Sequence, residues 1–190
     1  MVARVASGGR HGMRVATTAG ELGEAAQLLV AFNTEYDDPA PAPQWLAEHL
    51  GRLVEGGDTS VLTIDEPGTA TGDGPGPAVG VAVLRFRVST WSADLEAYLA
   101  EFYVQPGLRG RGIGTVFLDE VIEHARSRGA TYLDLNTSED DEAARHLYEK
   151  RGFDCHEGDG EGPLALYYEL DLGAPDPVPA PRRAHGGMAD

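Results

Sequence analysis

The chain has 190 residues, of which 42% are hydrophobic, 31 are Asp or Glu and 15 are Lys or Arg, giving a formal net charge of −16. This length predicts one domain with a real core, and the charge disfavours a nucleic-acid binder and favours a cationic partner. No run approaches the roughly 20 apolar residues of a membrane span.

Cys155 is the only cysteine, which excludes an internal disulfide and favours a reducing cytoplasm. No apolar segment follows the N-terminal arginines, so no signal peptide is predicted. The six histidines show no ligand spacing with cysteine or acids, so no metal site is predicted, and Cys155 is expected to pack in the interior. The oligomeric state is open between monomer and homodimer.

The chain divides into one patterned region between two ends that lack an apolar repeat. We expect residues 1–12 and 173–190 to be disordered and residues 13–172 to form a single domain. The predicted elements, in chain order, are a strand at 13–17, helices at 18–36 and 43–54, strands at 60–64, 79–88 and 96–104, a helix at 114–128, a strand at 131–136, a helix at 138–151 and a strand at 164–172. This order indicates an α/β (α+β) domain with a mixed, mostly antiparallel sheet of six to seven strands, flanked by about four helices.

The stretch QPGLRGRGIG, residues 105–114, joins a strand to a helix and is typical of an anion-binding loop. Glycines let the backbone approach a ligand, the first amides of a helix have no partner inside it, and two arginines add charge. A P-loop is disfavoured because no Lys-Ser or Lys-Thr pair occurs, and a dinucleotide fingerprint because GxGxxG is absent. A plain glycine-rich turn remains the alternative.

The loop matches the pattern [RQ]xxGx[GA] at Arg109, Gly112 and Gly114, between the strand end EFYV and an amphipathic helix. About twenty residues later comes LDLNTSEDDEAARHLYEKRGF. Together these motifs resemble the GCN5-related N-acetyltransferase (GNAT) superfamily from about Glu96 to Phe153. The resemblance implies a GNAT-like fold with acetyl-CoA as the acyl donor and no metal.

The resemblance also implies which residues hold acetyl-CoA. The pyrophosphate loop maps onto Arg109, Gly110, Arg111, Gly112, Ile113, Gly114 and Thr115. The strand positions that pair with pantetheine and the acetyl carbonyl map onto Phe102, Tyr103 and Val104, and the Val104 amide would steady the oxyanion. Further positions facing the donor map onto Asn136, Asp141, Ala144 and Tyr148. Many relatives have Asn where this chain has Asp141, so either a donor contact or a role at the helix start is expected there.

Two side chains are candidates for the chemistry. An alkyl amine is less than about 0.1% neutral at pH 7, so a carboxylate that takes its proton would assist attack on the thioester. Glu101, three residues before Val104, is the first candidate and Glu96 the second; an ion-paired or solvent-facing acid is the alternative for Glu101. Tyr148 matches a tyrosine placed near the thioester sulfur, where its hydroxyl can hydrogen-bond the leaving thiolate, unless it is a packing residue.

The sequence therefore predicts an acetyl-CoA-dependent N-acetyltransferase that acts by direct transfer in a ternary complex. The expected acceptor is a primary amine of a small molecule or peptide, and Glu35, Asp37 and Asp38 between the first two helices could attract a cationic one. No nucleic acid or membrane is expected as a partner. A non-catalytic module that senses acetyl-CoA is the alternative function.

Overall fold

The computed structural model of the chain describes residues 12–69, 75–158 and 160–170. Its elements are β1 (Met13–Val15), α1 (Ala19–Glu35), α2 (Pro43–Glu55), β2 (Thr59–Asp65), β3 (Ala78–Val88), β4 (Leu95–Val104), a 3-10 turn (Pro106–Leu108), α3 (Ile113–Ser127), β5 (Ala130–Leu135) and α4 (Glu142–Glu149). Of the predicted disordered ends, 1–12 and 173–190, only Gly12 lies within the described residues. None of the helices in this part of the chain is long and apolar enough to cross a membrane.

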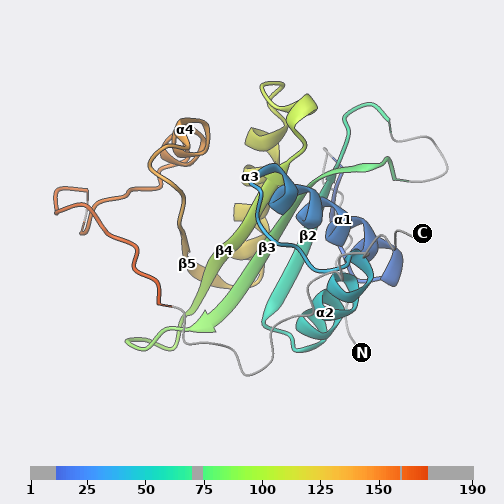
Figure 1. Cartoon of the computed structure of the whole chain (residues 1–190). Helices are drawn as coiled ribbons and strands as arrows, with labels where there is room; N and C mark the ends of the chain where they lie inside the picture. The colour runs from blue at the N-terminus through green and yellow to red at the C-terminus, as the bar shows by residue number, and fades with distance from the viewer. Residues whose placement is uncertain (1–11, 70–74, 159, 171–190) are drawn as a thin grey trace, which may run out of the picture.

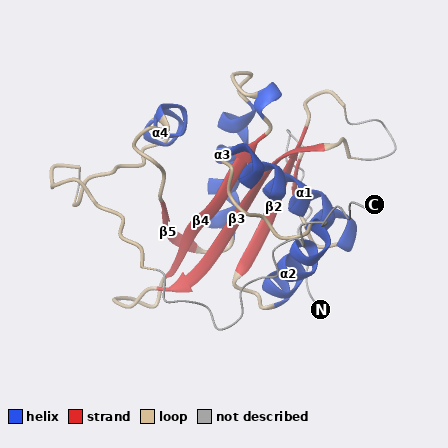
Figure 2. Cartoon of the chain, viewed as in Figure 1, coloured by secondary structure: helices blue, strands red, loops and turns tan. Residues whose placement is uncertain are grey.

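The strands form one sheet in the order β1-β2-β3-β4-β5. The pairs β1–β2, β2–β3 and β3–β4 are antiparallel, whereas β5 runs parallel to β4 because α3 carries the chain back between them. Helices α1 and α2 cover one face of the sheet and α3 covers the other (Figures 1 and 2). The predicted mixed, mostly antiparallel sheet flanked by four helices is therefore confirmed.

Two apolar clusters, one on each face, hold these layers together. Val61, Val81 and Val83 pack under α1 and α2, while Leu62, Ala82 and Leu84 pack under α3. This alternation follows the two-residue period of strands that are buried on both faces. At the start of α1, Thr18 and Glu21 form the expected capping box, in which each side chain accepts a hydrogen bond from the other residue's backbone N–H.

The prediction of six to seven strands is wrong, because the described residues form five. The segment 164–172 was expected to be a strand. Its described part, residues 164–170, pairs only with residues 155–156, through an isolated bridge at Leu164 and a 2.8 Å bond from the Ala165 N–H to the Cys155 carbonyl. Leu166, Tyr168 and Leu170 are exposed. Their apolar pattern is compatible with a strand, but it does not encode which edge the strand would join.

Candidate active site

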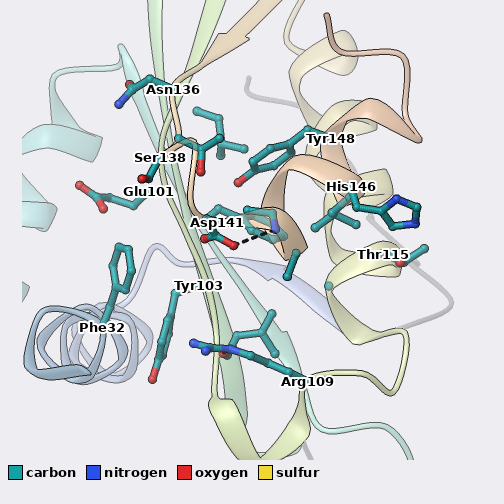
Figure 3. Close-up of a pocket in the computed structure, with 18 of the residues that line it drawn as sticks. Phe32, Glu101, Tyr103, Arg109, Thr115, Asn136, Ser138, Asp141, His146 and Tyr148 are labelled. Carbon is teal, nitrogen blue, oxygen red and sulfur yellow. Dashed lines mark hydrogen bonds between the residues drawn. The ribbon is translucent and has the colours of Figure 1, made fainter. Parts of the chain in front are cut away.

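A cleft of about 920 Å³ opens where β4 ends, between α1, α3 and α4 (Figure 3). The residues predicted to serve catalysis or acetyl-CoA binding line this cleft, with the exception of Arg111, Ile113 and the second base candidate, Glu96. Residues from 32 to 150 in the chain therefore meet at one place. The sheet creates the opening, because the β4–β5 ladder runs only from Leu95↔Ala130 to Leu99↔Leu135, and the rest of β4 continues without this neighbour.

A β-bulge in β4 decides the direction of the Glu101 side chain. Glu101 pairs with Val83 and Leu99 pairs with the adjacent Leu84, so Ala100 is an extra residue opposite β3. The extra residue reverses the alternation of side chains along the strand. As a result Glu101 lies on the α1 side of the sheet, with Val83, instead of in the cluster beneath α3.

The Glu101 carboxyl is half-buried in the cleft, and this burial raises its pKa, with the positive charge of Arg85 opposing the rise. A carboxylate with a raised pKa is a stronger base than one in water. Glu96, the second candidate, does not line the cleft: it accepts a 3.0 Å bond from Arg87 Nε. Hydrogen bonds from Ser89 and Arg87 lower the pKa of Glu96, which makes it a poorer base.

The glycine loop has the backbone geometry expected of an anion site. Gly110 and Gly112 adopt left-handed conformations, with φ of 73° and 82°, which L side chains rarely adopt. Gly112 is the N-cap of α3 and has no side chain to satisfy the first amides of the helix. These amides can donate hydrogen bonds to a phosphate at the mouth of the cleft, and the helix dipole favours its negative charge. Thr115 and Gly114, in the first turn of α3, line the same wall.

The three loop residues with larger side chains have different surroundings. Ile113 is buried in the cluster beneath α3, so its side chain anchors the loop and only its backbone could serve the site. Arg111 lines a neighbouring hollow of about 340 Å³ together with Gly112, Ile113 and Val116. Arg109 lines the main cleft, but its guanidinium donates to the Glu35 carboxylate. Sequence patterns could not reveal this pairing between α1 and the loop.

Tyr148 projects from α4 toward the middle of the cleft, with Glu101 on the other side of the central strands (Figure 3). The residue is 8% exposed, and its ring makes edge contacts with Phe102 and Phe153. Burial, with a smaller contribution from the charge of Asp141, raises the pKa of Tyr148 to about 12. The ring therefore packs in the core while its hydroxyl faces the site.

Asp141 is the N-cap of α4: its Oδ1 accepts a 2.9 Å hydrogen bond from the Ala144 N–H. The helix thus begins at Glu142, four residues later than expected from Ser138. The reason is that the Asp141 side chain satisfies an amide that the helix itself leaves open. Asn136 directly follows β5 and lines the cleft, and its Oδ1 accepts a hydrogen bond from the Tyr98 hydroxyl.

Replacing Asp141 with Ala is expected to lower the free energy of unfolding by about 1 kcal/mol, because the Ala144 N–H loses its acceptor. The matched change Asp141→Asn keeps a capping oxygen and should cost only a few tenths of a kcal/mol. Urea denaturation of the two variants and the parent measures the difference. Equal losses in both variants would argue against the cap.

Some cleft residues were missed by the sequence analysis. His146 on α4 and Lys150, the residue that caps its C-terminus, line the cleft one turn apart, and the Lys150 ammonium offers a positive charge that an anion could use. Their spacing of four residues was the available signal. Phe32, Asn33 and Tyr36, at the end of α1, also line the cleft, and only the tertiary structure brings α1 there.

Cys155 is exposed, so the prediction that it packs in the interior is wrong. It lies beside Asp154 and His156, and the potential ligand atoms of the three residues are within 4.8 Å of one another. His156 Nδ1 is 2.9 Å from Asp154 Oδ1, which pairs these two groups already. The trio lies outside the cleft.

Comparison with known proteins decides the family. The sequence profile described as "Acetyltransferase (GNAT) family" matches residues 26–153, which include the glycine loop, Glu101 and Tyr148. The chain belongs to this family. The predicted resemblance is confirmed, and the two motifs that carried it lie within the matched region.

Individual relatives agree with this assignment. A thialysine N-epsilon-acetyltransferase of Bos taurus is 33% identical over 103 residues, 49% of this chain and 60% of the relative. Streptothricin acetyltransferase of Streptomyces lavendulae is 35% identical over 78 residues, 41% of this chain and 39% of the relative. A crystal structure from Arthrobacter sp. FB24, assigned to the acetyltransferases, superposes with a TM-score of 0.69 at 37% identity and covers 83% of this chain and 94% of that one. The GNAT chain thus spans 60% or less of the length of these curated relatives.

Proposed function

We propose that this GNAT protein is an N-acetyltransferase that moves the acetyl group of acetyl-CoA to a primary amine by direct transfer. One observation carries the proposal: a single cleft, at the place where β4 leaves β5, is lined by an open helix N-terminus, a carboxyl with a raised pKa and a buried tyrosine. Anion binding, proton acceptance and leaving-group stabilisation are the three tasks of acetyl transfer from a thioester to an amine.

In the proposed step, Glu101 accepts a proton from the ammonium form of the acceptor, directly or through one water. The neutral amine nitrogen then attacks the acetyl carbonyl and forms the new C–N bond. The C–S bond breaks, coenzyme A leaves as a thiolate, and the amide nitrogen loses its second proton to solvent or to the thiolate. No covalent bond to the protein is formed, so both substrates must be bound together.

Tyr148 is proposed to donate a hydrogen bond to the departing sulfur. Its pKa of about 12 is higher than that of an ordinary thiol, about 8.5, so complete proton transfer to the thiolate would be uphill by about 5 kcal/mol. A hydrogen bond from the hydroxyl to the developing negative charge needs no such transfer. The raised pKa therefore supports a stabilising donor and not a general acid.

Changing Tyr148 to Phe is expected to lower kcat by about tenfold or more while acetyl-CoA affinity stays within about threefold. The ring and its packing against Phe102 and Phe153 are retained, so stability should be nearly unchanged. Tyr132→Phe, at an exposed position of β5, is the matched control and should have no effect. Parallel losses of stability and activity in Tyr148→Phe would instead support a packing role alone.

The acceptor is proposed to be a cationic small molecule or peptide. Glu101 and Asp38 place negative charge on the α1 side of the cleft, and the chain as a whole is strongly acidic. The names of the relatives specify amines, thialysine and streptothricin, as substrates of those proteins. A cytoplasmic location, as the single cysteine suggests, is part of the same proposal.

The proposal is tested by a thiol-release assay with acetyl-CoA over a panel of primary amines that includes thialysine, alongside calorimetry with acetyl-CoA. Release of coenzyme A that depends on one of these amines, with a matching acetylated product in the mass spectrum, is the expected result. Tight acetyl-CoA binding without turnover of any amine would point to the sensor function instead.

A further inference from the structure

The two arginines of the glycine loop have different surroundings. Arg109 Nη1 and Nη2 donate to Glu35 Oε1 and Oε2 at 2.6 and 2.8 Å, a forked, bidentate pair. Its Nε donates to the Val104 carbonyl at 2.8 Å, and the guanidinium lies 5.4 Å from the centre of the Tyr103 ring. Arg111 is exposed and forms no ion pair within residues 12–69, 75–158 and 160–170. Three of the five N–H donors of Arg109 are thus engaged by protein groups, among them both arms of the fork.

Glu35 is the last residue of α1. The residues that follow it, including Tyr36 and Asp38, line the side of the cleft where the acceptor is proposed to bind, here called the acceptor-side wall. The turn is braced from within, because Asn33 Nδ2 donates to the Pro39 carbonyl at 3.0 Å. The Glu35–Arg109 pair links this wall to the glycine loop.

Val104 is the other end of the link. It is the last residue of β4 and lies beyond the point where β5 stops pairing, so its position depends on β3 and on contacts such as the Arg109 bond. An arginine that holds both the Val104 carbonyl and the Glu35 carboxylate fixes the distance between the strand that presents the thioester and the wall that presents the amine. Bidentate pairing supplies a defined geometry that a single charge–charge contact does not.

We propose that Arg109 is a positioning residue that clasps the acceptor-side wall to the end of β4, and that the exposed Arg111, which lies in the neighbouring hollow beside Gly112, turns toward the acetyl-CoA pyrophosphate and supplies the side-chain charge. This differs from the sequence expectation for Arg109 and rests on the proposed function. A phosphate that took the same two N–H groups of Arg109 would displace the Glu35 carboxylate and leave it, negatively charged, beside the ligand. Arg111 shares its hollow with Asp65 and Glu66 but forms an ion pair with no acid among the described residues.

Calorimetry with acetyl-CoA separates the two arginines. Arg111→Gln is expected to weaken binding about fivefold or more and to reduce its dependence on salt, whereas Arg109→Gln and Glu35→Gln should stay within about threefold of the parent. If Arg109 served the phosphate, Glu35→Gln would free its fork and tighten binding, and Arg109→Gln would weaken it about tenfold. That pattern would overturn the proposal.

Hydrogen exchange tests the clasp without any acceptor. Glu35→Gln should speed amide exchange in residues 33–42, Arg109→Gln should speed it in both 33–42 and 100–105, and Arg111→Gln in neither. Arg109→Lys keeps the charge but loses the fork, so its exchange rates should lie between those of the parent and Arg109→Gln. Unchanged exchange at 33–42 in both Glu35→Gln and Arg109→Gln would contradict the clasp.

The kinetic consequence is that the KM for the acceptor changes and the KM for acetyl-CoA does not. With thialysine as acceptor probe, Glu35→Gln should raise the acceptor KM by about threefold or more, while the acetyl-CoA KM stays near that of the parent. A rise in the acetyl-CoA KM alone would count against the clasp. If the parent turns over no amine in the panel, the proposed function fails, but calorimetry and hydrogen exchange still decide the role of Arg109.

Discussion

Replacing Glu101 with Gln should lower kcat at pH 7 by about 100-fold or more. The amide keeps the shape of the side chain but cannot accept a proton from the ammonium form of the acceptor. At pH 9–10 more of the amine is neutral in solution, so the defect should shrink if loss of the base is its cause. The measurement is a pair of pH–rate profiles, variant and parent, on one amine.

Glu96→Gln is the matched control, because Glu96 lies on the same strand but outside the cleft and is paired with Arg87. It should leave kcat within about threefold of the parent. If Glu101 only attracts a cationic acceptor, the variant will raise KM with kcat nearly kept, and added salt will mimic it. A kcat defect that stays constant from pH 7 to 10 would also contradict the role of Glu101 as a base.

Burial of Glu101 makes a second, independent readout possible. A carboxyl whose pKa is higher in the folded protein than in the unfolded chain holds its proton more tightly when folded. The stability that this proton uptake adds to the fold is therefore fully present below the pKa of the unfolded chain, about 4.5. It is lost as the pH rises through the pKa of Glu101 in the folded protein. Glu101→Gln should accordingly be more stable than the parent at pH 7, and the difference should narrow below pH 4.5.

Changing Gly112 to Val should weaken acetyl-CoA binding at least tenfold, or about 1.4 kcal/mol. A Cβ added at Gly112 would meet no protein atom within 4 Å, so the space beside the loop is open to a ligand that a branched side chain would block. The φ of 82° also strains any L residue, at a cost of about 1–2 kcal/mol in stability. Calorimetry at a temperature where the variant is folded measures the affinity.

Gly129→Val separates strain from blockage. Gly129, at the opposite end of α3, has a φ of 93° and equally open space around its missing Cβ. The two variants should lose similar stability, but only Gly112→Val should lose affinity for acetyl-CoA. Unchanged affinity in a folded Gly112→Val protein would remove the pyrophosphate loop from the proposal.

Local features of this protein could be predicted from the sequence, because their causes lie within a few residues. The Thr18–Glu21 capping box needs only residues three apart, and the glycine loop before α3 needs only its own conformational freedom and the open amides of the helix. The family could likewise be predicted from two short motifs, both of which lie within the region matched by the family profile. For the same reason the predicted elements agree with the structure through α4, apart from shifts at their ends.

Only the tertiary structure decided what depends on distant partners. The bulge at Ala100 turns Glu101 to the α1 side, and a pattern of alternating residues cannot show an extra one. The pairing of Arg109 with Glu35 joins residues 74 positions apart, so loop composition alone favoured phosphate as its partner. The segment 164–170 has the composition of a strand but pairs with residues 155–156, because a strand's place depends on a partner edge that its own residues do not specify.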